Sequence, residues 1–167
     1  MILVDKDIIE RSKEIFINGY DEENVKPISY DIHISEIITE HGNVDEYDLK
    51  SKEAIMVKCI EEINVPTDLL IRVENKNSLI RKGITIVSPV YNPGHKTPIY
   101  LRVDNISPDT FRISKNLCIA QMVFEQLSSK PIHTYDQQVM HHSIMNGNTK
   151  DYLITKIIMK KERTTKE

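Results

Sequence analysis

The chain has 167 residues and a formal net charge of −3, with 40% hydrophobic and 28% charged residues. These values suit one globular domain that buries roughly 70% of its unfolded surface, and the weak net charge gives no basic field for nucleic acid. The start, "MILVDKD", lacks the apolar region of a secretory signal, and no run reaches the ~18 apolar residues of a membrane span. We therefore expect a cytoplasmic protein with neither nucleic acid nor membrane as a partner.

Residues 5 to 16, "DKDIIERSKEIF", have the spacing of an amphipathic helix. Apolar residues such as Ile8, Ile15 and Phe16 fall on one face, and Asp5 is placed to cap the first turn. The polar stretch "INGYDEEN" that follows predicts the turn that ends this helix.

Short strands are predicted from there to Leu127, because apolar residues alternate with polar ones between turn signals. The segments, in order, are "SYDIHIS", "EAIMVKCI", "DLLIRVEN", "GITIVS", "PIYLRVDN", "TFRIS" and "LCIAQMVFEQL". Regular short strands of this kind indicate an all-β barrel or sandwich. Cys59 and Cys118 lie in two of these strands, and we expect both to be buried, reduced thiols.

The last forty residues have a different pattern. "IHTYDQQVMHHSIMNGNTK" is polar and mixed, which predicts a loop or an arm. "DYLITKIIMKK" places four apolar residues between Leu153 and Ile158 on one face, which predicts a helix, and a solvated tail follows. We therefore divide the chain into a domain at residues 1–150 and a C-terminal helix and tail at residues 151–167.

The densest polar cluster is "VENKNSLIRKGI", residues 73 to 84, with Lys76, Asn77, Ser78 and Arg81 around a predicted turn. Lysine, arginine, a hydroxyl and backbone donors in one short stretch can hold phosphates. The alternative is a solvated loop followed by a basic surface turn, and composition alone favours that alternative. The six histidines show no pair at zinc-ligand spacing, so we expect no metal site built by the protein.

Residues 92 to 105, "NPGHKTPIYLRVDN", start as a turn and continue as a strand. Ile99, Leu101 and Val103 alternate with polar residues, so we expect these three side chains to be buried. Arg102 lies on the opposite, polar face of the predicted strand.

Five ordered motifs resemble those of the dCTP deaminases, within the dUTPase-like superfamily. They are "MILVDKDI", "VKPISYDIHIS", "VENKNSLIRKGI", "SPVYNPGHKTPIYLRVDN" and "NLCIAQMVFEQLS", and the match runs from Met1 to about Leu127. The second motif keeps Ser29 and Asp31 of the family's Ala-Ser-Val-Asp-Leu segment. The resemblance implies a mainly β, dUTPase-like distorted β-barrel with an N-terminal helix and a C-terminal helix or arm, assembled as a homotrimer.

The resemblance also implies a chemistry. Family sites lie between subunits and bind a deoxypyrimidine triphosphate with Mg²⁺, and deamination there needs no zinc. A glutamate on the strand after the Asp-Pro-Gly turn moves protons while water attacks C4 of cytosine, helped by a serine and an arginine. The loosely similar segment "TYDQQ" lacks the family's glycine and would place Tyr135 and either Gln137 or Gln138 over the ligand.

Three positions of the phosphate motif match the family. The catalytic arginine corresponds to Arg81, the basic phosphate-binding residue to Lys76, and one of the serines to Ser78. These residues would bind the nucleotide if the resemblance extends to the ligand.

Three other reaction positions are substituted: Asn77 replaces the serine that assists the water, Asn92 the aspartate that meets the deoxyribose, and Arg102 the glutamate. A guanidinium cannot accept a proton, so a contribution of typically ~10²–10⁴-fold should be missing. His95, on the turn after Asn92, is the remaining candidate base. We expect the Arg102 side chain to face a cleft near Arg81 and Asn92.

Three functions are open at this point. The one we adopt is a nucleotide-binding protein with impaired catalysis, a sensor, sink or regulator that uses Lys76, Ser78, Arg81 and Arg102. The second is an active divergent dCTP deaminase that converts dCTP and water to dUTP and ammonia. Within this second function, dUTPase activity is less favoured than deamination. The third is a trimeric protein-interaction module without nucleotide binding, which the apolar face at residues 153–158 favours.

Overall fold

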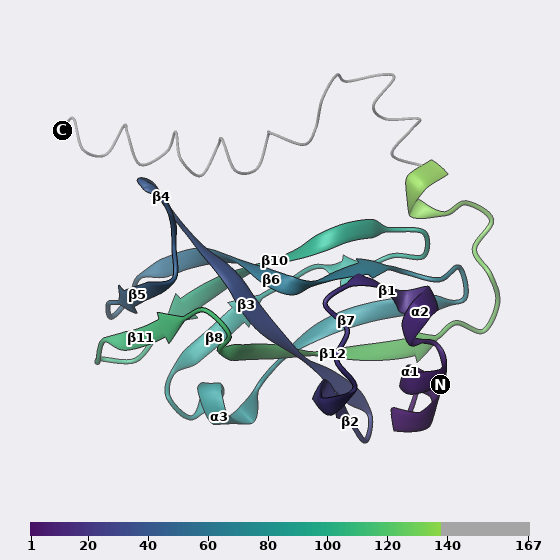
Figure 1. The fold of residues 1–167 in the computed structure, drawn as a ribbon, viewed down its shortest axis with the longest axis horizontal. Helices are drawn as coiled ribbons and strands as arrows, with labels where there is room; N and C mark the ends of the chain where they lie inside the picture. Colours follow the sequence, from purple (N-terminus) through teal and green to yellow (C-terminus); the bar gives the residue numbers. More distant parts are fainter. Residues whose placement is uncertain (138–167) are drawn as a thin grey trace.

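The computed structural model describes residues 1–137, which form one curled sheet of ten strands and a separate two-stranded sheet (Figure 1). The mainly β prediction is confirmed. The long strands are β3 (Ser29–Thr39), β6 (Ala54–Asn64), β7 (Leu69–Asn75), β10 (Lys96–Asn105) and β12 (Cys118–Gln126). The short strands are β1 (Phe16–Asn18), β2 (Val25–Lys26), β4 (Gly42–Val44), β5 (Glu46–Leu49), β8 (Ile84–Val87), β9 (Val90–Tyr91) and β11 (Phe111–Ser114). The helical elements are α1 (Asp5–Glu10), α2 (Ser12–Ile15), α3 (Asn77–Ile80) and the 3-10 turn η1 (Glu22–Asn24).

Strand β3 joins the two halves of the large sheet. The strands pair in the order β8-β10-β6-β3-β12-β7-β9, and all these pairs are antiparallel. Beyond a bulge, β3 pairs with β6 at one end, where Ile34 is opposite Cys59, and with β12 at the other end, where His33 is opposite Cys118. In Figure 1, β3 runs diagonally across the molecule between these two groups of strands.

The core is built from the inward residues of the long strands. Ile99, Leu101 and Val103 are all fully buried, so the predicted face of β10 is confirmed. Both cysteines are free, and Cys59 is buried as predicted. Cys118 is only partly buried, because it begins β12 and lies opposite the polar residue His33 of β3.

The N-terminal helix differs from the prediction in two ways. It ends at Glu10 and resumes at Ser12, because the intervening Arg11 has a ψ of 4°, outside the α-helical range. The guanidinium of Arg11 is bound by the Asp68 carboxylate, with N–O distances of 2.8 and 3.1 Å. The predicted cap is wrong as well, because Asp5 is the first helical residue and the Asp7 carboxylate accepts the Val4 N–H at 3.2 Å.

Within residues 1–137, no helix is long and apolar enough to cross a membrane. The helix predicted at the C-terminus, and the boundary predicted at residue 150, lie outside the described residues.

Candidate functional site

The polar turn at residues 76–81 is held in place by its buried neighbours. Lys76 precedes α3, Arg81 ends it, and Leu79 between them is buried in the core. Gly83 then adopts a φ of +72°, and a Cβ there would lie 2.7 Å from the Cβ of Ser107, so only glycine fits. The turn is therefore anchored to the core by Leu79 and Gly83, which leaves Asn77, Ser78 and Arg81 exposed.

Asn75, the last residue of β7, ties this turn to the sheet. Its Oδ1 accepts the N–H of Ile86 on β8 at 2.7 Å, and its carbonyl oxygen accepts Nε2 of Gln121 on β12 at 3.2 Å. Gln121 in turn accepts the hydroxyl of Ser29 on β3 at 3.1 Å. The start of the polar turn is thus bonded, directly or through Gln121, to three strands.

Lys76 is already paired within the chain. Its Nζ donates to Oδ1 of Asp31 on β3 at 2.5 Å, and the two side chains are only 23% and 13% exposed. A partly buried carboxylate needs such a partner. Lys76 therefore reaches the site as half of an ion pair, which the sequence pattern alone did not predict because the partners are 45 residues apart.

The other side chains of the turn face solvent. Asn77, Ser78 and Arg81 are exposed. Among the ion pairs within residues 1–137, none involves Arg81. An exposed guanidinium without a carboxylate partner, next to a hydroxyl and an amide, is suited to binding phosphate oxygens.

The turn at Asn92 forms a second group. Gly94, with a φ of +83°, and the next residue, His95, exchange backbone hydrogen bonds with Val65 at 2.8 and 2.9 Å. The Tyr135 ring stacks on the His95 ring with centroids 3.9 Å apart, and the Tyr135 N–H donates to the carbonyl oxygen of Pro93 at 2.8 Å. Tyr135 therefore does reach the Asn92 turn, within its own chain.

The histidine of this second group has an altered acidity. Burial lowers the pKa of His95, so its imidazole is neutral at pH 7. Gln137 lies nearby in the chain and accepts the Thr134 N–H at 3.1 Å, whereas Gln138 lies outside the described residues.

Arg102 forms a third group, on the outer face of β10. Its side chain is 57% exposed, and its Nε donates to Oδ1 of Asp104, two residues along the same face, at 2.9 Å. It is opposite Met56 on β6 and Val87 on β8. Within residues 1–137, no hydrogen bond or ion pair joins Arg102 to Arg81 or Asn92. The contacts within residues 1–137 thus divide the expected site residues into three groups: the turn at residues 76–81, the Asn92 turn and the outer face of β10.

One buried carboxylate was missed at the sequence level. Glu61 on β6 is 1% exposed, its Oε2 accepts the N–H of His33 at 3.2 Å, and its Oε1 lies 3.5 Å from Nδ1 of His33. The signal was present, because a period of two places Glu61 on the same face as Cys59 and Ile63, both of which are buried.

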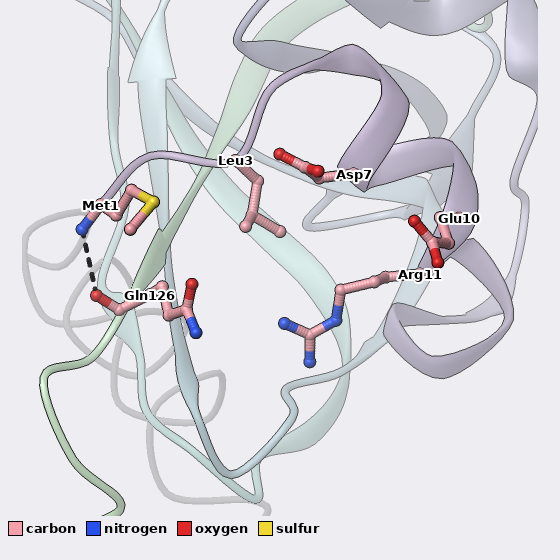
Figure 2. A pocket seen from close by; sticks show the side chains of 6 residues that line it. All are labelled: Met1, Leu3, Asp7, Glu10, Arg11 and Gln126. Atoms are coloured by element: carbon pink, nitrogen blue, oxygen red, sulfur yellow. Dashed lines mark hydrogen bonds between the residues drawn. The ribbon is translucent and has the colours of Figure 1, made fainter.

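A surface hollow lies elsewhere, between the N-terminal helices and the end of β12 (Figure 2). Its lining residues are Met1, Leu3, Asp7, Glu10, Arg11 and Gln126. None of the expected site residues lines it, and its arginine is bound by Asp68. We assign this hollow no part in the site. In the part of the chain that is described, no three His, Cys, Asp or Glu side chains are grouped to hold a metal ion.

Comparison with solved structures defines the class of fold. The chain is similar to the 2'-deoxycytidine 5'-triphosphate deaminase of Agrobacterium tumefaciens, with a TM-score of 0.64 and 16% identity over 75% of this chain and 47% of that one. It is also similar to the EIAV dUTPase, with a TM-score of 0.52 and 16% identity over 73% and 91% of the two chains. This is the dUTPase-like fold, as predicted, although the chain spans about half the length of the Agrobacterium protein.

The sequence comparisons identify the family. Residues 37–127 match the model of the dCTP deaminase-like family. The chain is 26% identical to the dUMP-forming dCTP deaminase of Hydrogenobaculum sp., over 78% of this chain and 85% of that protein. It is 24% identical to the dCTP deaminase of Pyrococcus horikoshii, over 74% and 83%. The chain belongs to the dCTP deaminase-like family, and its function is related to nucleotides.

Proposed function

We propose that this protein binds a deoxypyrimidine triphosphate, or another phosphorylated nucleotide, through its turn at residues 76–81 and does not carry out the family's deamination. The observation that carries the proposal is Arg102. It lies on the outward face of β10, at the position that the resemblance assigns to the catalytic glutamate, and it is paired with Asp104. Such a protein would act as a sensor, a sink or a regulator of the nucleotide.

The loss of chemistry follows from the groups present at the three substituted positions. A guanidinium cannot take the proton of an attacking water, and neither of the amides at Asn77 and Asn92 is a base. The binding groups remain, because Ser78 and Arg81 face solvent on the fixed turn and Lys76 lies behind them with Asp31. With Arg102 in place of the family's glutamate, the outer face of β10 is more favourable to an anion than it would be with a carboxylate there.

We propose a homotrimer, because the resembled site takes residues from neighbouring chains and no hydrogen bond or ion pair within residues 1–137 joins the three groups of expected site residues. The exposed face of β10 supports this: Arg102 lies there beside Val87 and Tyr100, which leave apolar surface uncovered. Mg²⁺ would arrive with the triphosphate, whose oxygens are the hard ligands that it prefers. Residues 1–137 provide no cluster that would hold a metal ion without the nucleotide.

Light scattering should therefore give a mass of three chains of 19.4 kDa each at micromolar concentration. Burial of the apolar side chains on the outer face of the sheet favours association, and the shared site needs a second chain. A monomer under these conditions would contradict both the trimer and the shared site.

Replacement of Arg81 tests the binding site. Arg81→Ala should weaken the affinity for dCTP with Mg²⁺ by about ten- to a hundred-fold, because a charge-assisted hydrogen bond to phosphate is lost. Calorimetric titration at fixed, moderate salt measures the change. Lys115→Ala is the matched control, since it removes a positive charge from the loop between β11 and β12. Equal affinity of wild type and Arg81→Ala would exclude this turn as the phosphate site.

One assay separates the three functions. Wild-type protein is incubated with dCTP and, separately, with dUTP, and product formation is compared with nucleotide-induced changes in melting temperature. Binding without product supports the proposal, whereas ammonia or uracil nucleotide as product would make the protein an active enzyme. If the protein shows neither binding nor product, the function that remains is that of a protein-interaction module.

A further inference from the structure

The phosphate turn is connected to a buried carboxyl group through strand β3. Asp31 and His33 are alternate residues of β3, and each has a partner on a different element. Asp31 accepts Nζ of Lys76 at 2.5 Å, and the N–H of His33 donates to Oε2 of Glu61 at 3.2 Å. A two-residue step along one strand therefore separates the contact at Glu61 from the contact at the phosphate-binding lysine.

Glu61 occupies the place where β3 leaves β6 for β12. The last aligned pair before the carboxyl group is Ile34 with Cys59, and beyond it Glu61 reaches across to His33. Its side chain is 1% exposed, and burial raises its pKa to about 7, opposed by the hydrogen bond from the His33 N–H. A carboxyl group in this position is therefore half ionised near neutral pH.

The titratable groups around Glu61 are neutral at pH 7. The titratable side chains that interact electrostatically with it are Tyr30, Cys59 and Cys118. Burial raises the pKa of each of these three, so all are neutral at pH 7. Burial lowers the pKa of His33, so its imidazole is also neutral there. On the side of β1, uncharged Gly19 packs against the backbone of Glu61.

Cys118 lies between Glu61 and the Asp31–Lys76 pair and interacts electrostatically with all three. Cys118 lies opposite His33 on β12, and burial raises the pKa of its thiol to about 11. Asp31 and Glu61 raise this pKa further and Lys76 lowers it, so all three charges lie around the same side chain. A change of charge at Glu61 therefore changes the electrostatic potential behind the Asp31–Lys76 pair.

We propose that Glu61 is a positioning residue of the phosphate turn, whose ionisation places a second negative charge behind the Asp31–Lys76 pair and weakens polyphosphate binding as the pH rises through neutrality. This inference rests on the proposed function, because it assumes that the turn at residues 76–81 binds phosphates. It adds regulation by pH to that site. Lys76 and Arg81 attract the ligand, whereas Glu61 opposes them only when it is ionised.

The test uses inorganic tripolyphosphate with Mg²⁺ as the probe, titrated calorimetrically into the full chain at pH 6, 7 and 8. Glu61→Gln stays neutral and keeps an acceptor for the His33 N–H. The wild type should bind as tightly as Glu61→Gln at pH 6 and about three- to ten-fold more weakly at pH 8. Because wild type and Glu61→Gln are compared at the same pH, the effect of the probe's own protonation on affinity cancels. Glu62→Gln is the matched control, because Glu62 follows on the same strand, faces the other way and accepts the Asn18 amide.

A second measurement needs no ligand. The side-chain NMR signals of Lys76 should shift with a midpoint near pH 7 in wild type and in Glu62→Gln, and should lose this transition in Glu61→Gln. If they do so while no variant binds tripolyphosphate, the coupling holds and the phosphate site is wrong. If wild type and Glu61→Gln bind the probe with the same dependence on pH, or if the Lys76 transition survives in Glu61→Gln, the role of Glu61 is overturned.

Discussion

Wild-type protein is expected to release no more ammonia from dCTP than a buffer blank, and Arg102→Glu alone is expected to remain inactive. Loss of the proton carrier alone removes a factor of about 10²–10⁴. The single replacement leaves Asn77 and Asn92 in place, and residues that act together in one reaction do not contribute additively. It also places a carboxylate beside Asp104, which then loses its partner. A coupled assay for ammonia at saturating dCTP measures the result.

The triple variant Asn77→Ser, Asn92→Asp, Arg102→Glu restores all three family positions and should regain measurable deamination while Arg81 is present. The same triple variant with Arg81→Ala is the control, and it should be inactive. Steady ammonia release by the wild type would refute this account. His95 would then be the first residue to replace, by glutamine, because its neutral imidazole lies on the Asn92 turn.

Glu61→Gln should stabilise the protein at pH 8 by roughly 3 kcal/mol relative to wild type. Burial raises the pKa of Glu61 from 4.5 to about 7, so the folded state holds the proton more tightly than the unfolded state. The free energy of unfolding of the wild type therefore falls as the pH rises from about 4.5 to 7, and the loss persists above pH 7. The neutral amide does not ionise and escapes this loss.

Urea denaturation at pH 4.5, 6 and 8 measures this effect, at one protein concentration because subunit association adds to stability. The difference between Glu61→Gln and wild type should be near zero at pH 4.5 and largest at pH 8. Glu62→Gln should follow the wild type throughout. A difference that is constant with pH would mean that Glu61 is not the titrating group.

The fold was predictable because its signals are local. Alternation in "PIYLRVDN" placed Ile99, Leu101 and Val103 in the core, and the turn residues marked where strands end. The break in the N-terminal helix was not predictable, because no glycine or proline marks it. The ion pair of Arg11 with Asp68, 57 residues away, was not predictable either. Contacts of that separation leave no trace in a local pattern.

The candidate site was predictable in its parts and not in its arrangement. The motif spacing gave the exposed Ser78 and Arg81 on one turn, but it could not show that Lys76 is paired with Asp31. That Arg102 faces a cleft near Arg81 stays a prediction, and its described polar contact is with Asp104. Short-range patterns tell which side of a strand a residue occupies, whereas neighbours in space depend on the whole topology.

The path of β3 has a consequence for cooperativity. Because this one strand is bonded to β6 at one end and to β12 at the other, the two halves of the sheet share a single backbone segment. The two ladders use different residues of β3, 30–33 with β12 and 34–38 with β6, and only the continuous backbone of this strand connects them. Asp31 and His33 lie in the β12 ladder, in the middle of the strand order. Fraying of the edge strands β8 and β9 therefore leaves them paired.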